Sequence, residues 1–547
     1  MSNTPAQSAR GAAWGSEEQK RRIRRRYRTD RRLRLYGILA ISAAIALLAV
    51  LIASLVRTGY TAFVQTKIEL AVPLDTRYID PAKPEAGRYR VVVRNAFRAL
   101  FPDIRSRAQL RQIDKILSSE ARFIVRDYVL AHPDQVGKTV TLLLPLSDPF
   151  DQLHKKVIPA RIPALSDEQI RFFQALMERK IVAQENGRTV IELDIHVNPA
   201  LVEPGDLENS NYGAVLKDSF RSQMTKLGLR PLESVLARDA AQLLKAHVEA
   251  RPEVIGRHVR MKIPVAKPYD TLFKGSVPME LNPRFASLEQ IKAYESLVER
   301  GLLRMPFNWE LFLNADSRFP ERAGLAGAIK GSFYTLLVCF LISFPVGIAA
   351  GIYLEEFAPA NRLTNLIEVN INNLAAVPSV VFGLLGLAVF LGFLGLPRSA
   401  PLVGGMTLSL MTLPTIIIAT RAALKGVPPS IREAALAVGA SKHQVMLHHV
   451  LPLALPGILT GTIIGLAQAL GETAPLLLIG MNAFITSASG GILDPATALP
   501  TQIYSWADSP ERGFVSRTSA AILVLLGFLV LMNAVAIFFR QRFERKW

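Results

Sequence analysis

Cysteine is almost missing from this sequence, since Cys339 is the single one among 547 residues. One cysteine excludes an intramolecular disulfide and any zinc or iron–sulfur site built from several cysteines. Charged residues are also scarce at 20%, against about 25% in typical soluble domains. Acidic residues are outnumbered by basic ones, 45 to 64, so the net charge is +19. Such an excess indicates nucleic acid or an anionic membrane surface, and its distribution along the chain decides between them.

Uncharged apolar stretches recur along the chain, and each is about as long as the roughly 20 residues that a helix needs to cross a bilayer. They are residues 35–56, 331–354, 369–396, 399–420, 450–471 and 518–539. A buried helix of a soluble protein explains one such stretch, but not six in one chain. The sequence therefore predicts an α-helical integral membrane protein with six transmembrane helices.

The first apolar stretch follows a strongly basic segment. Residues 1–34 hold a run from Lys20 to Arg28 in which almost every residue is basic. Because this run adjoins a membrane span, we interpret it as a topology signal that keeps the N-terminus in the cytoplasm, rather than as a nucleic-acid site. Residues 35–56 are longer than the apolar core of a signal peptide, so we expect them to remain as a membrane anchor.

Counting crossings from a cytoplasmic N-terminus predicts the remaining topology. Residues 57–322 form an extracytoplasmic domain, residues 323–547 form a core with five transmembrane helices, and the basic C-terminal tail with Arg545 and Lys546 is cytoplasmic. Residues 473–493 are uncharged, but they contain a proline and a glycine pair. We therefore reject a seventh span and extend the fifth helix a few residues past Glu472 instead.

The region 57–322 has alternating apolar patterns and helical patterns, which together predict a mixed α/β domain. Three segments have the pattern of strands: residues 89–93, 139–146 and 189–197. Three others have the spacing of amphipathic helices: residues 167–179, 238–251 and 288–300. No internal repeat is apparent. Asp151, His154 and Lys155 lie close together without the spacing of a metal site or a catalytic triad, and we expect them to form a solvated turn.

Motifs for nucleotide binding and catalysis are missing. The segments nearest to a phosphate-binding loop, at residues 327–332 and 439–442, lack its glycine and lysine spacing. We therefore expect no catalytic residue, no metal and no cofactor in this chain.

A cytoplasmic segment has the pattern of two short helices joined by a turn. Ser430 and Glu433 have the spacing of a capping box, and Glu433-Ala434-Ala435 begins a good helix. Gly439 then permits a turn, and a second helix leads to Leu451-Pro452. A helix–turn–helix between two spans, with small residues on one face, is a shape on which a partner protein can dock.

This segment resembles the EAA loop of type I permeases of ABC importers, in which the loop docks on a separate ATP-hydrolysing subunit. The resemblance rests on Glu433, Ala434, Ala435, Gly439 and the pair Leu451-Pro452. It implies a MetI-like permease core over residues 323–547, with the docking loop at 425–452. His449 departs from the family, which often has isoleucine there.

A second motif is similar to a segment of phosphate permeases of the PstA type. It runs from Ala467 to Leu477 and includes Gly471-Glu472-Thr473-Ala474-Pro475. Because an ionisable residue in or beside a membrane helix is costly, Glu472 is a functional candidate, although a carboxylate that only reaches the outer interface explains it too. Gln468, Glu472, Thr473, Pro475 and Arg421 are our candidates for the translocation path.

Two positions depart from that family. Many relatives carry arginines where Ile418 and Gln468 stand here, and a guanidinium binds phosphate through a bidentate fork that glutamine lacks. Arg421, one turn beyond Ile418, either compensates or anchors the helix at the membrane surface. The charge that binds the anion then comes from this chain or from a partner permease.

The resemblance implies a phosphate importer of the bacterial inner membrane. Its expected partners are a homologous PstC-like permease, two copies of a PstB-like ATPase subunit and an external PstS-like phosphate-binding protein, with membrane lipid around the spans and no nucleic acid. Two alternatives stay open: a permease for another oxyanion such as molybdate or phosphonate, and a membrane-anchored sensor or scaffold that uses the external domain.

Overall fold

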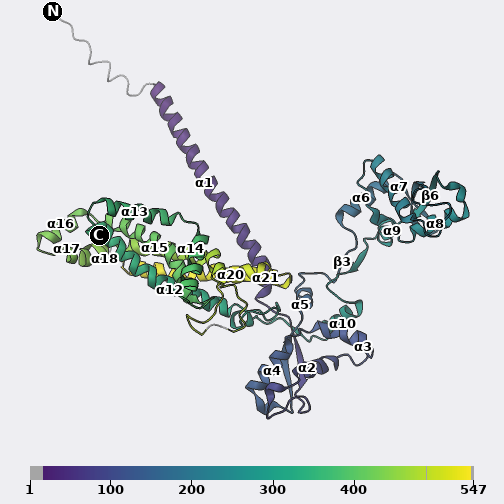
Figure 1. Ribbon diagram of the computed structural model, residues 1–547, viewed down its shortest axis with the longest axis horizontal. Coiled ribbons are helices and arrows are strands. Elements are labelled where there is room, and N and C mark those ends of the chain that lie inside the picture. Colours follow the sequence, from purple (N-terminus) through teal and green to yellow (C-terminus); the bar gives the residue numbers. More distant parts are fainter. Residues whose placement is uncertain (1–16, 488–489, 544–547) are drawn as a thin grey trace, which may run out of the picture. The chain divides into compact units, whose positions relative to one another are not determined.

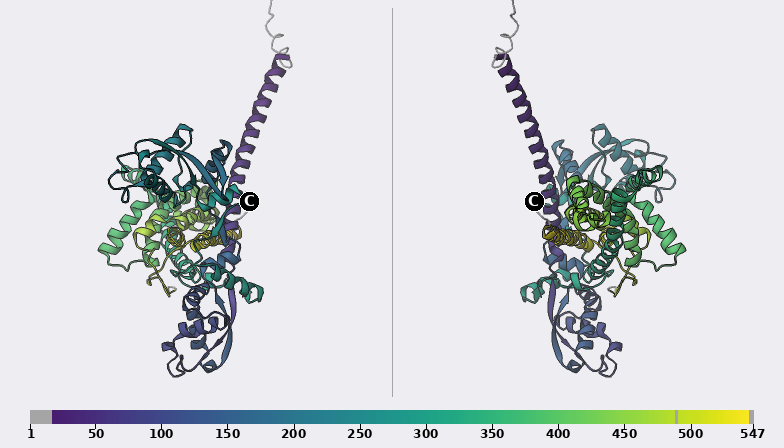
Figure 2. Two further views of the ribbon diagram at one scale, coloured as in Figure 1. Left: turned by 90° about the vertical axis from the view of Figure 1, so that its right-hand side faces the viewer. Right: turned by 90° about the vertical axis from the view of Figure 1, so that its left-hand side faces the viewer.

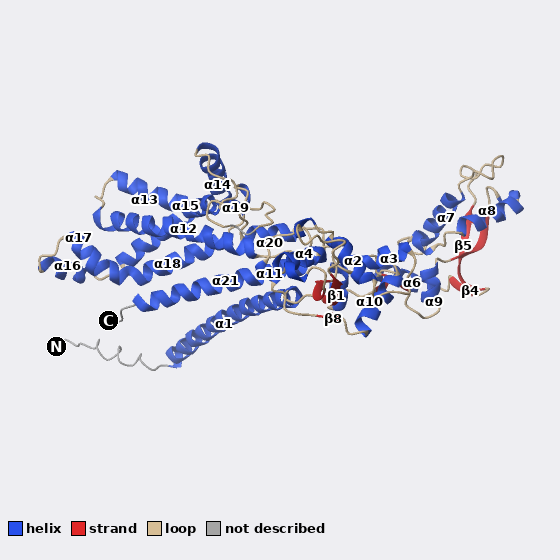
Figure 3. Cartoon of the chain, turned by 90° about the horizontal axis from the view of Figure 1, so that it is seen from below, coloured by secondary structure: helices blue, strands red, loops and turns tan. Residues whose placement is uncertain are grey.

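The computed structural model describes residues 17–487 and 490–543, so the predictions for residues 1–16 and for Arg545 and Lys546 lie outside the described part. The chain divides into two units. The first contains residues 1–103, 114–155 and 297–547, and the second contains residues 104–113 and 156–296. In the described residues, strands occur only between α1 and α12 (Figure 3).

Long helices dominate the first unit, and α1 is a continuous helix through the basic and apolar segments (Figures 1 and 2). The helices outside the strand-bearing region are α1 (Glu17–Gly59), α11 (Glu310–Leu313), α12 (Ala326–Ile352), α13 (Arg362–Ala375), α14 (Ser379–Leu385), α15 (Pro401–Lys425), α16 (Pro429–Ala437), α17 (Lys442–Gln444), α18 (Leu451–Gly471), α19 (Ala474–Leu478), α20 (Leu499–Ala507) and α21 (Gly513–Phe543). Helices α12 and α18 also include wider π-helical turns, at Tyr353–Phe357 and Val445–Val450. Five helices are long and apolar enough to cross a membrane. They contain five of the six predicted stretches.

The sixth predicted stretch, residues 369–396, is not one straight helix. It is divided between α13 and the segment from α14 to Phe393, which are bent by 104° at the break. The break coincides with Pro378, because a proline disfavours a helical conformation in the residue before it. In addition, α13 carries Asn370 and several other polar residues, and none of its residues is buried.

Glycines allow α12 and α15 to pack closely, and their contacts give the direction of each helix. A Cβ atom on Gly405 would meet Val338, one on Gly347 would meet Ile416, and one on Gly351 would meet Thr420, each within 2.6 Å. Residue numbers rise together in both helices, so α12 and α15 run parallel. The bent pair between them must therefore return from one end of the bundle to the other, and it serves as the sixth crossing.

The last two long helices alternate in direction. Gly461 of α18 packs on Ala419 of α15, and Gly465 packs near Thr412, so these helices are antiparallel. Arg540, near the end of α21, donates to Thr460 in the middle of α18 at 3.4 Å. Residues 525–532 of α21 pack with Leu466, Ala469 and Leu470 near the end of α18, so these two helices are also antiparallel. The end of α1 packs on the start of α21, where a Cβ atom on Gly59 would meet the Ala520 backbone at 2.9 Å.

The α/β part of the first unit has a three-stranded antiparallel sheet in the order β2-β1-β8. Its elements are β1 (Lys67–Pro73), α2 (Tyr89–Arg98), α4 (Ala121–Ala131), β2 (Thr139–Pro145), α5 (Asp148–His154) and β8 (Leu303–Arg304). Alternate residues of β1 are buried, namely Ile68, Leu70 and Val72. This period of two places one face of the strand in a core.

The second unit has the same kind of sheet, in the order β4-β5-β6. Its elements are α3 (Arg107–Ile113), β3 (Arg161–Pro163), α6 (Asp167–Glu178), β4 (Val182–Glu185), β5 (Arg188–His196), α7 (Tyr212–Lys226), α8 (Ala240–Ala250), β6 (His258–Pro264), α9 (Lys267–Phe273), β7 (Met279–Leu281) and α10 (Leu288–Glu299), the last of which ends in the first unit. Phe173, Phe220 and Leu244 belong to one continuous apolar core beneath the sheet.

Most of the elements predicted in this region are present, but the strand predicted at residues 89–93 is wrong. These residues begin helix α2, in which Tyr89, Val92, Val93, Ala96 and Phe97 are buried. That spacing of three, four, seven and eight residues follows one face of a helix. The short run Val91-Val92-Val93 hides this period when it is considered alone.

The structure also contradicts the expectation of no internal repeat. Residues 116–156 and 235–275 have the same order of elements, each position lying 119 residues after its counterpart. Gly137 and Gly256 both have positive φ, and each donates its N–H to the residue after the first strand, at Leu74 and Val197. The repeat escapes inspection because fewer than a third of the aligned positions keep the same residue, and buried positions tolerate exchanges among apolar residues of similar volume.

The third strands of the two sheets have different origins. β4 forms a hairpin with β5 through the two-residue turn at Asn186 and Gly187, so the second sheet is completed locally. β8 follows the second repeat in sequence but pairs with β1, so the first sheet is completed by a distant part of the chain.

The predicted solvated turn at Asp151 and Lys155 is wrong as well. Asp151 lies in α5 and Lys155 directly follows it, and their side chains are only 16% and 8% exposed and form an ion pair of 2.5 Å. Asp151 Oδ1 also accepts a hydrogen bond from the Thr66 backbone at 2.7 Å. The second repeat has the same arrangement, in which Asp270 pairs with Lys274 and accepts from the Thr189 backbone.

Candidate functional site

The loop that resembles an EAA loop forms α16, a turn and α17, between α15 and α18. Glu433 and Ala434 are exposed on α16, whereas Ala435 is buried. Ala435 belongs to an apolar cluster with Leu424, Val445, Met446 and other residues of α15 and α18. One face of α16 is therefore packed on the helical bundle, and the face with Glu433 is directed away from it.

Gly439 forms the turn after α16 with φ of +87°, a conformation that favours glycine. The predicted turn is therefore confirmed, but the predicted capping box at Ser430 and Glu433 is wrong. Helix α16 begins at Pro429, whose fixed φ starts a helix without a side-chain cap. The capping box is instead formed by Ser441 and Gln444, at the start of α17.

Two apolar side chains are exposed beside this turn. Leu436 is 46% exposed and Val438 is 85% exposed. Leu436 lies three residues after Glu433, and Val438 directly precedes Gly439, where an added Cβ atom would meet nothing within 4 Å. Leu451 and Pro452, the last residues of the motif, begin α18 and are partly buried.

Arg432 attaches α16 to the rest of the bundle. Its guanidinium donates to Glu356 Oε1 at 2.8 and 3.2 Å, and to the carbonyl oxygens of Leu424 and Val427 at 2.8 and 2.7 Å. Both side chains of the ion pair are about three-quarters buried. Because Glu356 continues from α12 and Leu424 belongs to α15, one side chain holds the docking loop on two transmembrane helices.

Arg421 belongs to a second ionic cluster near the same end of α15. It pairs with Glu355 at 3.2 Å and with Glu368 of α13 at 2.7 Å. Lys425 also lies 3.6 Å from Glu355. Arg421 is thus satisfied by two carboxylates at the end of the bundle that carries the docking loop.

Gln468 and Glu472 lie at the opposite end of α18, so the structure does not bring Arg421 together with them. The predicted extension of this helix past Glu472 is wrong, because α18 ends at Gly471 and Glu472 has an extended backbone with ψ of 120°. Pro475 accounts for the end, since its ring would clash with the carbonyl of Gly471 in a continuous helix. Gln468 and Glu472 therefore do not share a helix face.

The chain after Glu472 is held by close packing. Thr473 precedes α19, and Pro475 lies in its first turn. A Cβ atom on Gly383 of α14 would meet the Pro475 Cα at 2.7 Å. Gln468 is exposed and Glu472 is partly exposed, and neither has an ion-pair partner among the described residues.

Sequence reasoning missed the acidic partners in this site. Glu355 and Glu356 are not among the predicted site residues, although each binds an arginine near α16. The sequence does contain a pattern that indicates these ion pairs. Two adjacent acidic residues follow one predicted span, and two arginines, Arg421 and Arg432, follow another, so opposite charges are available to pair.

Two family models match the chain. A "Domain of unknown function (DUF3333)" matches residues 20–164 and 187–282. A "Binding-protein-dependent transport system inner membrane component" matches residues 343–547. The second match includes every candidate residue described above.

Curated relatives match the chain over less than half of its length. The phosphate transport system permease protein PstA of Pasteurella multocida (strain Pm70) is 32% identical over 248 residues, which cover 45% of this chain and 86% of that protein. The chain belongs to the family of PstA-type permeases. PstA of Haemophilus influenzae is 30% identical over 252 residues, which cover 86% of its length. The probable ABC transporter permease protein YqgI of Bacillus subtilis is 27% identical over 247 residues, which cover 83% of that protein.

Among solved structures, a chain of the inward-facing MetNI methionine ABC transporter is similar, with 19% identity and a TM-score of 0.32. The match covers 40% of this chain and 98% of that chain. The family matches and the long apolar helices show that this PstA-type permease is a multi-pass protein of the inner membrane, with a helical ABC-permease core. The tandem α/β repeats are additional to that core.

Proposed function

We propose that this PstA-type permease is one half of the translocation path of an ATP-driven phosphate importer, and that it docks its ATPase subunit through α16 and the turn at Gly439. The phosphate assignment is supported by relatives named phosphate transport permeases, which the chain matches over 86% of their length. ATP hydrolysis then belongs to a partner, and a homologous permease and an external binding protein complete the importer.

The observation that carries the docking role is the exposed tip of the loop. Leu436 and Val438 present apolar surface that nothing in the described chain covers, next to the carboxylate of Glu433. Exposed apolar residues gathered with a charged group are typical of a protein interface. The contacts of Arg432 with Glu356 and with α15 make the loop rigid enough to transmit a push from the ATPase to α12 and α15.

The topology of the importer follows from the helix directions. The docking loop, the end of α21 and the end of α12 lie at one end of the bundle, which we assign to the cytoplasm because basic residues such as Arg540 and Arg542 gather there. The region 57–322 is then extracytoplasmic. The partner permease would cover the exposed face of α18 at Ile464 and Gln468.

Uptake of radiolabelled phosphate tests the substrate. We would express the chain with its partner subunits in cells that lack other high-affinity phosphate uptake, and compare them with cells lacking only this chain. Uptake should require the chain and should be unaffected by excess molybdate. Uptake of molybdate or phosphonate in place of phosphate would reject the assignment while leaving the permease fold intact.

Two single-cysteine variants test the topology, because the native Cys339 is buried. A membrane-impermeant thiol reagent should label a cysteine at Asn186 in intact cells, and should label one at Arg545 only after permeabilisation. Labelling of the Arg545 position alone in intact cells would invert the proposed topology.

A further inference from the structure

The two α/β repeats differ in what occupies one equivalent cleft. In the first repeat, the cleft beside the starts of β1 and α5 is filled by the chain's own segment just before α12. Gln65 Nε2 donates to the Glu321 carbonyl at 2.6 Å, and the Asp148 backbone N–H donates to Glu321 Oε1 at 2.8 Å. Glu120 forms an ion pair with Arg322 at 3.4 Å. Gln65, Asp148 and Glu120 thus bind a turn that presents Glu321 and Arg322.

Strand register and the common offset identify the counterparts of these three residues. Thr66 and Thr189 both donate their backbone N–H to the aspartate that begins the ion pair of the following helix. Gln65 therefore corresponds to Arg188. The offset of 119 residues pairs Asp148 with Lys267, and Glu120 with Asp239.

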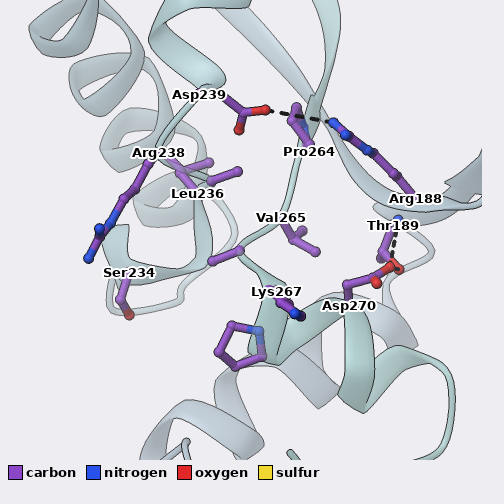
Figure 4. A pocket seen from close by; sticks show the side chains of 13 residues that line it. Arg188, Thr189, Ser234, Leu236, Arg238, Asp239, Pro264, Val265, Lys267 and Asp270 are labelled. Atoms are coloured by element: carbon purple, nitrogen blue, oxygen red, sulfur yellow. Dashed lines mark hydrogen bonds and ion pairs between the residues drawn. The ribbon is translucent and has the colours of Figure 1, made fainter. Parts of the chain in front are cut away.

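All three counterparts line a cavity of about 800 Å³ in the second repeat (Figure 4). Leu236, Pro264, Val265 and Pro268 form the apolar part of its lining. The corresponding cleft of the first repeat contains Glu321, whereas no described residue of the second unit fills this one. The volume of the cavity is much larger than that of a single phosphate ion.

The charge of the cavity differs from that of the filled cleft. Arg188 replaces Gln65, Lys267 replaces Asp148, and Arg238 stands at the position of Ser119. Figure 4 shows Arg188 and Arg238 on opposite sides of the cavity, with Lys267 between them. Arg188 has an ion pair of 3.7 Å with Asp239, while Arg238 and Lys267 have none among the described residues. The second cleft therefore has more positive charge, and favours a more acidic occupant.

We propose that the cavity of the second repeat is a docking site for a short segment of another protein that turns and presents a carboxylate followed by a basic residue, bound as the first repeat binds the turn at residues 320–322 of its own chain. A glutamate or aspartate of the segment would lie near Lys267 and Arg188, and a following basic residue would pair with Asp239, as Arg322 pairs with Glu120. The proposal is independent of the transported substrate, because the site lies outside the permease core.

The experiment uses the purified full chain in detergent and a fluorescent synthetic peptide with the sequence of residues 314–324. Binding is measured by fluorescence anisotropy, together with a peptide in which Glu321 is replaced by glutamine. We expect saturable binding that weakens about tenfold for Lys267→Glu or Arg188→Glu, and also for the glutamine peptide, since charged pairs at such sites contribute on the order of 1–2 kcal/mol. Arg260→Glu is the matched control, because Arg260 is exposed on β6 outside the cavity.

Three results would overturn the proposal. The first is no saturable binding of the peptide, and the second is binding that Lys267→Glu and Arg260→Glu weaken equally. The third is evidence that the site binds another anion. That evidence would be displacement of the peptide by millimolar inorganic phosphate, or binding of the chain to phosphatidylglycerol vesicles that Lys267→Glu abolishes. Circular dichroism of each variant separates loss of binding from loss of folding.

Discussion

Arg432 on α16 and Glu356 at the end of α12 form an ion pair with two short N–O distances, 2.8 and 3.2 Å. The two residues are far apart in sequence, and the pair is mostly buried. Together with the two carbonyl contacts of the same guanidinium, it joins α16 to α12 and to the end of α15. We propose that this connection carries a docking event on the loop to the membrane helices.

We predict that Arg432→Ala lowers ATP-driven phosphate uptake at least about tenfold while the protein remains in the membrane, because four hydrogen bonds to a largely buried charged group are lost. Arg432→Lys should recover little, since an ammonium group cannot reproduce the planar fork. Arg362→Ala, at an exposed arginine of α13, is the control. Normal uptake by Arg432→Ala at matched membrane levels would contradict the role of this pair.

Different substitutions of Gly439 distinguish the effect of backbone strain from the effect of a blocked docking surface. An alanine pays about 1–2 kcal/mol at a positive φ, whereas asparagine and aspartate tolerate that conformation better. An added side chain meets nothing in this chain, so it would enter the space that we assign to the ATPase. We therefore expect Gly439→Asp and Gly439→Asn to uncouple uptake more than Gly439→Ala, with normal membrane levels. Co-purification of the ATPase subunit measures docking directly, and the reverse order of effects would indicate strain alone.

Glu472 remains our candidate for the translocation path, although it follows α18 instead of belonging to it. An unpaired carboxylate near the membrane is costly, so we expect it to pair with an arginine of the partner permease. Glu472→Gln should then impair phosphate uptake more than assembly, whereas Gln468→Ala should weaken uptake only modestly. Uptake by Glu472→Gln within roughly twofold of the wild type, with membrane levels matched, would instead support a carboxylate that only anchors the chain end.

The buried carboxyl group of Glu321 should make the stability of the folded chain depend on pH. Burial raises the pKa of this carboxyl group to about 7, from an ordinary value of 4.5. The unfolded chain loses the proton near pH 4.5 and the folded chain near pH 7, so this contribution to stability is fully present below 4.5 and is lost as the pH rises to 7. The loss is on the order of 3 kcal/mol.

Thermal unfolding of the purified chain at pH 5 and pH 8 measures this effect. The difference in unfolding temperature between the two pH values should be smaller for Glu321→Gln than for the wild type. Glutamine cannot ionise, but its side-chain oxygen still accepts the hydrogen bond from the Asp148 backbone. Glu299→Gln, at an exposed position of α10, should retain the difference of the wild type. An unchanged difference in Glu321→Gln would show that other groups cause it.

The positions of most membrane helices could be predicted from the sequence, because a helix in hydrocarbon must satisfy its own backbone and exclude charge over a length that the bilayer sets. The turn at Gly439 and the segments 139–146, 167–179 and 288–300 were also readable, since local periodicity and a single glycine decide them. The bend near Pro378 and the end of α18 before Pro475 were present in the sequence as well, but length and hydropathy alone concealed them.

Other features depend on residues that are distant in the chain. The parallel packing of α12 and α15, the ion pair of Arg432 with Glu356 and the pairing of β8 with β1 all join segments whose local sequence is compatible with many partners. The equivalence of the filled and open clefts appears only when the two repeats are compared as folds. Local sequence determines which segments are helices and strands, whereas the choice among partners is made by the packing of the whole chain, and only the tertiary structure records it.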